Sequence, residues 1–260
     1  MSEAEQPAGG VEQAESGAGQ SAGGSGEQPE IGAEQPAAPA RRWPGAVVGW
    51  MFVVIALGLI GGGGFVAALG LAEAVESLLL AAVTATTLGV AVAVVMAGDR
   101  ARMRAAGLRA APRRAVVMGA VLAMPLLPLC GGVATLVRMA LGQPVENPQV
   151  GVLFPESMTA GQAAVMAALV AGAVPFVEEL VFRGVLLDAL RERAGPGVAL
   201  VGSSLLFGLM HVEPSIVVAT ALLGGALGAL RLRSGSIWPS VALHAANNGL
   251  AMVAILLTEV

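Results

Sequence analysis

Long apolar runs alternate with short polar segments along most of this 260-residue chain. A helix of about 20 apolar residues is long enough to cross a lipid bilayer. Runs of about that length, the fifth and sixth being shorter, occupy residues 45–70, 77–98, 115–136, 159–190, 196–212, 215–230 and 236–257. This pattern predicts an all-α fold, a polytopic membrane helix bundle with about seven transmembrane helices.

The first forty residues differ from the rest, because they contain Gly, Ala, Glu, Gln, Ser and Pro and almost no bulky apolar side chain. Such a segment cannot bury enough apolar surface to offset the entropy lost on ordering, so we predict a disordered acidic tail. It lacks the basic start and apolar block of a secretory signal peptide, and the first hydrophobic helix is expected to stay in the mature protein. The expected organisation is a tail at 1–40, helices one to three at 41–140, and a second membrane domain with helices four to seven at 159–257.

Composition and charge set the surroundings of this bundle. The chain is 56% hydrophobic and 12% charged, which is more apolar than a typical soluble domain, so the expected partner is the lipid bilayer and no nucleic-acid-binding patch is implied. Its Arg residues gather at 41–42, 100–114, 191–193 and 231–233, in alternate loops. Because Arg-rich loops stay cytoplasmic, we predict an integral protein of the cell membrane with a cytoplasmic N-terminus and an external C-terminus.

The fourth apolar run contains three charged residues, Glu178, Glu179 and Arg183. Each costs roughly 2.5–3.5 kcal/mol at the bilayer centre on insertion scales, which favours either pairing or function. Glu179 and Arg183 are four residues apart and share a helix face, so we predict a buried structural ion pair. Glu178 is rotated by about 100° from Glu179 and has no local cation. Pro175 frees a backbone carbonyl nearby and loosens the helix there.

The two histidines of the chain fall in later predicted helices and have partners at helical spacing. Phe207 and His211 are four residues apart, as are His244 and Asn248, so each pair is expected on one helix face. A single intramembrane His is commonly an interhelical hydrogen-bonding residue, but two beside an unpaired carboxylate favour chemistry. Desolvation disfavours the charged form of Glu178 and makes it a stronger base, which suits it to take a proton from water.

The same residue types admit a metal-dependent and a metal-free mechanism. A neutral imidazole can position the water or bind a divalent metal, and a second imidazole with an amide can donate hydrogen bonds to an oxyanion. Glu178, His211 and His244 could supply two imidazoles and a carboxylate to zinc, with an open position for water. Both mechanisms hydrolyse an amide without a Ser or Cys nucleophile. The single Cys130 is expected as a small core residue.

Three motifs occur in order on successive predicted helices: Glu-Glu-x-x-x-Arg at 178–183, Phe-x-x-x-His at 207–211 and His-x-x-x-Asn at 244–248. Together they resemble the CAAX prenyl protease and bacteriocin-processing family of intramembrane peptidases. The resemblance extends over about residues 159–257, and the three motifs show no departure from the family pattern.

The resemblance implies roles for the motif residues. Glu178 would activate the hydrolytic water with His211, and His244 would stabilise the oxyanion with Asn248. The neighbouring ion pair would hold the helix in place. Members of the family are usually described as metallopeptidases, although this residue set also permits a metal-free glutamate mechanism.

The leading interpretation is therefore an endopeptidase that cuts membrane-associated or near-C-terminal peptides from the cytoplasmic side. One alternative is a non-enzymatic membrane scaffold or bacteriocin-immunity protein of the same fold, in which the polar residues only lock helices together. Another is a proton-coupled transporter, since membrane Glu and His residues also relay protons. No inverted repeat is visible in the sequence, which disfavours the transporter.

Overall fold

Helices form all the regular structure of residues 43–258, the part of the chain that the computed structural model describes. These residues belong to one compact unit, Ala40–Val260. The all-α prediction is therefore confirmed for this part. The acidic tail predicted at 1–40 lies outside the described residues.

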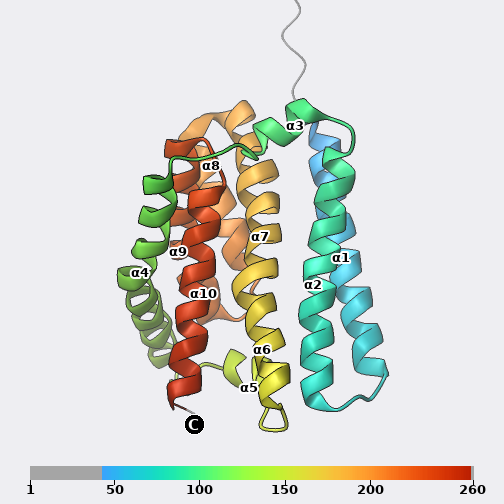
Figure 1. The fold of residues 1–260 in the computed structure, drawn as a ribbon, viewed down its shortest axis with the longest axis vertical. Coiled ribbons are helices and arrows are strands. Elements are labelled where there is room, and N and C mark those ends of the chain that lie inside the picture. The colour runs from blue at the N-terminus through green and yellow to red at the C-terminus, as the bar shows by residue number, and fades with distance from the viewer. Residues whose placement is uncertain (1–42, 259–260) are drawn as a thin grey trace, which may run out of the picture. The chain divides into compact units, whose positions relative to one another are not determined.

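The helices follow one another in an order close to the predicted one (Figure 1). They are α1 Gly45–Ala68, α2 Glu73–Met96, α3 Arg100–Ala105, α4 Arg113–Ala140, α5 Gln149–Leu153, α6 Ala160–Ala168, the π-helical η1 Leu169–Ala173, α7 Val174–Glu179, the π-helical η2 Leu180–Leu186, α8 Leu187–Leu209, α9 Pro214–Ser234 and α10 Trp238–Thr258. The short helices α3 and α5 were not predicted, because they lie in polar loops without a long apolar run.

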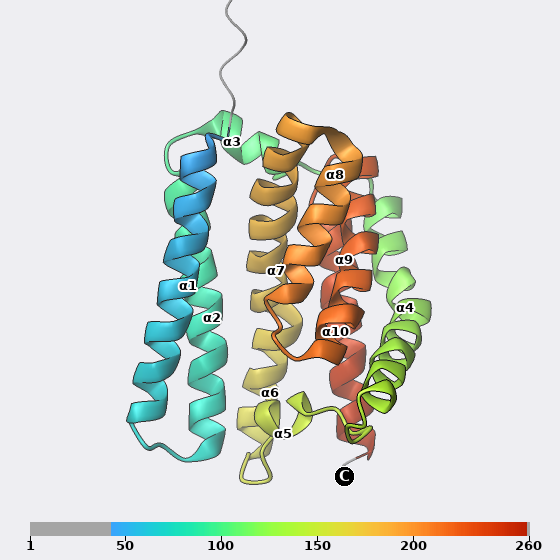
Figure 2. The same ribbon diagram turned by 180° about the vertical axis from the view of Figure 1, so that it is seen from behind.

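Five of the described helical stretches are long and apolar enough to cross a membrane: α1, α2, α4, the continuous stretch Ala160–Leu209, and α9. This supports an integral membrane protein. Inside α8, Gly195 has φ 80° and ψ 173°, which is not a helical conformation and is one that only glycine adopts readily. The chain reverses there, so that the rest of α8 runs back along the bundle (Figure 2).

Glycines bring neighbouring helices into close contact. A Cβ added at Gly58 or Gly62 of α1 would lie 2.5 Å from Thr87 or 2.6 Å from Val83 of α2. The glycine run at 61–64 does not interrupt the helix, since α1 is continuous. Small residues instead let the two backbones approach, as is common between membrane helices.

Gly224 and Gly228 of α9 allow a similar close approach. A Cβ at Gly224 would lie 3.1 Å from Ser204 Cα, and one at Gly228 would lie 2.6 Å from Leu200 Cδ1. Both neighbours belong to α8. The backbone of α9 also lies next to Arg183 of η2, since a Cβ at Gly224 would lie 3.2 Å from Arg183 Nη2.

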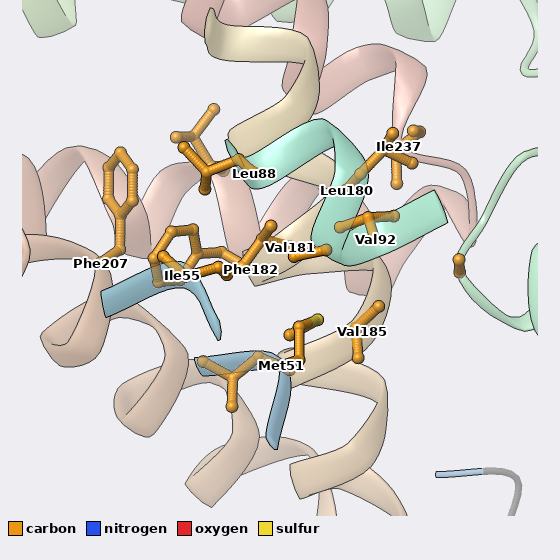
Figure 3. Packing of buried hydrophobic residues seen from close by; sticks show 14 of the residues in the cluster. Met51, Ile55, Leu88, Val92, Leu180, Val181, Phe182, Val185, Phe207 and Ile237 are labelled. Atoms are coloured by element: carbon orange, nitrogen blue, oxygen red, sulfur yellow. The ribbon is translucent and has the colours of Figure 1, made fainter. Parts of the chain in front are cut away.

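The apolar core lies where η2 packs against α1 and α2 (Figure 3). Val181 and Phe182 of η2 are buried against Met51 and Ile55 of α1 and Val92 of α2. Because the flanks of η2 are packed on both sides, the segment that carries Glu179 and Arg183 is held between the α1–α2 pair and the α8–α9 pair.

Hydrogen bonds gather the Arg-bearing loops at one end of the bundle, here called the Arg-rich end. Arg109 Nε donates to Gly235 O at 2.8 Å, and Arg231 Nη2 donates to Ala105 O at 2.6 Å. The Arg-rich end thus contains the start of α1, α3, the Gly195 turn and the end of α9. The opposite, Arg-poor end contains the α1–α2 loop, residues 141–159 and the α8–α9 turn.

Arg138 is the cation that anchors the Arg-poor end. Its side chain is only 3% exposed, and its Nε donates to Ser215 Oγ at 2.8 Å. Arg138 Nη2 lies 3.4 Å from Glu213 Oε2, and Nη1 donates to Glu146 O. These contacts join the end of α4 to the loop that follows it and to the start of α9.

Candidate active site

Two π-helical segments flank α7, which carries Pro175 and both adjacent glutamates. The Val174 N–H donates to Leu169 O, which is the π-helical i→i−5 pattern. The next bond of that pattern would join residue 175 to Val170 O, but Pro175 has no N–H. Asn248 Nδ2 of α10 donates to Val170 O instead, at 3.0 Å. Asn248 therefore satisfies the carbonyl that Pro175 leaves free.

Glu179 accepts two hydrogen bonds in the closed centre of the bundle. Its Oε1 lies 2.9 Å from Arg183 Nη1, and the side chains of both residues are 0% exposed. The same oxygen lies 3.0 Å from His244 Nδ1. The pairing with Arg183 follows the helical spacing of the sequence. The contact with His244 could not be derived that way, because 65 residues separate the partners.

His244 lies between the two glutamates. Its Nδ1 contacts Glu179, and its Nε2 lies 3.6 Å from Glu178 Oε2. This second separation is too long for a direct hydrogen bond, so the carboxylate of Glu178 faces the imidazole without being bonded to it. The sequence predicted that Glu178 has no cation near it in its own helix, and the structure agrees. The nearest basic side chain comes from α10.

Phe207 separates the guanidinium of Arg183 from the two imidazoles. Arg183 Cζ lies 4.3 Å from the centre of the Phe207 ring, a cation–π contact. The same ring meets His244 edge to face at 5.5 Å and His211 at 5.2 Å between centroids. Arg183 Nη2 also donates to Gly224 O at 3.3 Å. Phe207 thus positions the charged group in addition to filling space, a role that the sequence did not indicate.

His211 lies in a turn after the end of α8, and not inside a helix as the predicted run 196–212 implied. The reason is local: Met210 ends the helix, and Val212 has a positive φ of 63°, which stops helical propagation. His211 Nδ1 lies 3.1 Å from Phe207 O, which leaves Nε2 unused by that contact. Within residues 43–258, no hydrogen bond or ion pair joins His211 to Glu178.

Asn247 is a polar residue of the site that the motif analysis missed. It is 9% exposed, and its Oδ1 is buried with no hydrogen-bond partner. Its Nδ2 lies 3.4 Å from Oδ1 of Asn248, its neighbour. Position 247 lies inside the His-x-x-x-Asn motif at a variable position. The signal available in the sequence was only a second amide next to the first.

A cavity of about 410 Å³ connects these residues, and Glu178, His211, His244, Asn247 and Asn248 all line it. This volume lies in the range of small-molecule and cofactor sites. The structure therefore brings all four residues predicted as catalytic to one cavity. It leaves Glu179 and Arg183 outside its lining.

The side chains in this arrangement do not fit the zinc site considered from the sequence. In the described part of the chain, no group of three or more His, Cys, Asp and Glu side chains is placed to hold a metal ion. His244 Nδ1 contacts Glu179 and His211 Nδ1 contacts the carbonyl of Phe207, and both contacts leave Nε2 unused, as in metal-bound imidazoles. The disagreement therefore rests on the placement of the three side chains relative to one another, and we derive no catalytic step through a metal.

Residues 160–250 match the family described as Rce1-like, type II CAAX prenyl endopeptidase. No curated protein and no solved structure gives a significant match to the chain. The matched segment runs from the start of α6 into α10 and contains all three motifs, whereas α1–α5 lie outside it. The resemblance inferred from the motifs is thus confirmed: over residues 160–250 the chain matches the Rce1-like family of type II CAAX prenyl endopeptidases.

Proposed function

We propose that this protein is an intramembrane endopeptidase that cleaves membrane-associated peptides or proteins with a water activated by Glu178. The observation that carries this proposal is the difference between two adjacent carboxylates. Glu179 is sealed and paired with Arg183 and His244, whereas Glu178 lines the cavity and lies 3.6 Å from its nearest basic partner. A carboxylate held in that way is available to accept a proton from a substrate water.

The architecture that goes with this activity has seven spans. The Gly195 turn divides the stretch Ala160–Leu209 into two, and α10 adds a helix of 21 residues to the five candidates. The Arg-rich end would face the cytoplasm of a cell membrane, because ten described Arg residues belong to its loops and helix ends: 100, 102, 104, 109, 113, 114, 191, 193, 231 and 233.

The proposed reaction begins when Glu178 takes a proton from water while the water oxygen attacks the carbonyl carbon of the scissile peptide bond. His211, through the nitrogen that Phe207 does not use, positions that water. Protonated Glu178 then gives the proton to the amide nitrogen as the C–N bond breaks. The products are a carboxylic acid and an amine, and Glu178 returns to its starting state.

The oxyanion formed in the first step would be stabilised by His244 and Asn248. Asn248 donates one N–H of its amide to Val170 O, and the second N–H remains for the substrate. His244 would face the oxyanion with Nε2, the ring nitrogen that its contact with Glu179 leaves on the side of the cavity.

The test compares the protein with Glu178→Gln in cells, by identifying the new termini of membrane proteins that appear only with the active form. We expect a set of cleavage products that disappears with Glu178→Gln. With a product peptide in hand, turnover of the purified variant should fall by about 10²-fold or more, as for a missing general base. Its thermal unfolding, followed by tryptophan fluorescence, should be unchanged; Trp43 is buried in the folded bundle. Identical termini in both strains would instead favour a scaffold or immunity protein.

The same assay separates the two mechanisms left open by the sequence. Because no described group of three or more His, Cys, Asp and Glu side chains is placed to hold a metal ion, we expect purified protein that has been stripped of metal to keep its activity. Loss of cleavage on stripping, with recovery on adding zinc, would instead establish a metallopeptidase. Elemental analysis of the stripped sample is the control.

A further inference from the structure

The cavity extends from the site toward only one end of the bundle. On α10 its lining runs from His244 toward Ile255, and on η1 and α7 it runs from Glu178 back to Val170. The lining residues of α2, α4 and α9 likewise belong to the halves of those helices near the Arg-poor end: Ser77, Leu80, Ala81 and Thr84; Leu127, Cys130, Gly131 and Ala134; Ile216, Ala219, Thr220 and Leu223. Residues of α5 and the loop before it complete the wall.

The bundle is closed on the other side of the site. Glu179, Arg183 and Phe207 are 0% exposed and lie directly next to Glu178 and His244 on the side of the Arg-rich end. Beyond them Leu227 and Leu243 are also fully buried. No residue of the Arg-rich end lines the cavity. A peptide entering from that end would have to displace a packed and charge-paired layer.

The cavity wall has the chemistry of a peptide-binding surface. Apart from Glu178 and the two histidines, its polar groups are neutral amides and hydroxyls, among them Asn147, Gln149 and Thr84. The buried Oδ1 of Asn247 has no partner in the protein, although buried polar atoms are nearly always hydrogen-bonded. Because Asn247 lines the cavity, this oxygen can accept a hydrogen bond from a ligand, and the N–H of a peptide backbone is a suitable donor.

Resting on the proposed function, we infer that the substrate is a neutral peptide segment that enters from the Arg-poor end. That end is the external one, because the Arg-rich loops are cytoplasmic. The substrate class is then the part of a membrane-anchored protein or peptide that lies at the external surface, with Asn247 accepting a hydrogen bond from its backbone. A cytoplasmic C-terminal tail does not reach Glu178 by this route. The inference replaces the expectation that cleavage takes place from the cytoplasmic side.

The test measures from which side of the membrane the cavity can be reached, using a charged, membrane-impermeant methanethiosulfonate. The background is Cys130→Ala, since this cysteine is the only one in the chain and lines the cavity. Thr84→Cys places a thiol in the cavity, Val145→Cys marks the Arg-poor end and Met103→Cys marks the Arg-rich end. Val90→Cys, exposed on the same helix as Thr84 but outside the cavity lining, is the matched control for a lipid-facing thiol.

We expect Thr84→Cys and Val145→Cys to react in sealed right-side-out vesicles, and Met103→Cys to react only in inside-out vesicles. Val90→Cys should remain unreacted in both, because the reagent needs a thiolate in contact with water. Reaction of Thr84→Cys from the same side as Met103→Cys would overturn the inference, as would no reaction from either side. So would reaction of Val145→Cys from the cytoplasmic side.

Labelling does not depend on catalysis, so its outcome is separate from that of the proposed function. Thr84→Cys combined with Glu178→Gln should react like Thr84→Cys alone. If cleavage products persist with Glu178→Gln while the labelling pattern is as expected, the cavity faces outward but the peptidase proposal fails. If the products disappear while Thr84→Cys reacts from the cytoplasmic side, the peptidase proposal stands and the route proposed here is wrong.

Discussion

The two halves of the bundle on either side of Glu178 and His244 differ in what their buried polar residues contact. In the half near the Arg-rich end, each buried charge has a partner within the protein: Arg183 contacts Glu179, and Asp188 accepts from Trp43 Nε1 at 3.0 Å. In the other half, uncharged amides face a cavity, and the buried Oδ1 of Asn247 lacks any partner. In the closed half the buried atoms without a partner, such as Glu179 Oε2 and Arg183 Nε, belong to groups that are paired through their other atoms. Paired charges hold helices together in an apolar medium, whereas polar groups around a cavity remain available for a ligand. The comparison distinguishes structural from chemical residues that the sequence places side by side.

The largest expected effect comes from breaking the pair in the closed half. Glu179→Gln removes the negative partner of Arg183, and leaving one member of a buried ion pair alone typically costs about 3–5 kcal/mol. We expect a large fall in the unfolding temperature, measured by tryptophan fluorescence. The double variant Glu179→Gln, Arg183→Met should recover part of this loss, because neither charge is then left unpaired. Equal stability of the single and double variants would contradict the pairing argument.

Glu179 also contacts His244, so replacing it should change turnover as well as stability. The two effects can be measured separately. In an Arg183→Met background, Gln at position 179 keeps an oxygen that can accept from His244 Nδ1, whereas Leu does not. We therefore expect Glu179→Gln to retain more turnover than Glu179→Leu when both carry Arg183→Met and melt at similar temperatures. Equal turnover would show that Glu179 has no part in positioning His244.

The sequence was informative wherever residues interact within one helix. The spacing of Glu179 and Arg183 predicted their shared face, and the apolar runs predicted α1, α2, α4, α9 and α10 to within a few residues. It could not give the contact between Glu179 and His244, which joins distant segments. The sequence did not predict the π-helical segments, because one extra residue in a turn leaves the apolar run unbroken.

The cavity was also beyond the reach of sequence reasoning. Its position depends on which halves of five helices fail to pack closely, and an apolar run does not show where along its length a helix lacks a close neighbour. The placement of His211 inside a helix was wrong for a related reason, since the apolar run continues past the residue at which α8 ends. Length and hydropathy identify an apolar segment but not the turn that ends its helix.

A smaller effect is expected at the boundary between the two halves, where Asn248 combines a structural and a proposed chemical role. Asn248→Leu leaves Val170 O without a partner, which should cost about 1–3 kcal/mol for an unpaired buried group. Adding Pro175→Ala restores a backbone N–H that can reach this carbonyl, so thermal stability should partly return. Turnover should stay low if the second N–H of Asn248 stabilises the oxyanion. Recovery of both would assign Asn248 to structure alone.

The smallest effect concerns the ion pair between Arg138 and Glu213, in the half of the bundle that contains the cavity. It differs from the fully buried pair of Glu179 and Arg183 because water reaches it. Glu213 has a side chain that is 26% exposed. Desolvation opposes ionisation, but hydrogen bonds from Ser215 and Ile216 and the charge of Arg138 outweigh it and hold the pKa of Glu213 below its ordinary value of 4.5. Since the folded pKa is the lower one, the unfolded chain binds this proton more readily. The stabilisation is fully present above the pKa of the unfolded chain and is lost as the pH falls through the pKa of the folded protein.

We expect a loss of about 1 kcal/mol or less below about pH 5, as for exposed pairs, measured by tryptophan fluorescence during thermal unfolding. Glu213→Gln should flatten this dependence, whereas Glu156→Gln, at an exposed carboxyl of the same end, should leave it unchanged. If both variants keep the full acid dependence, another group carries the proton and the Arg138 cluster does not anchor the turn that holds His211.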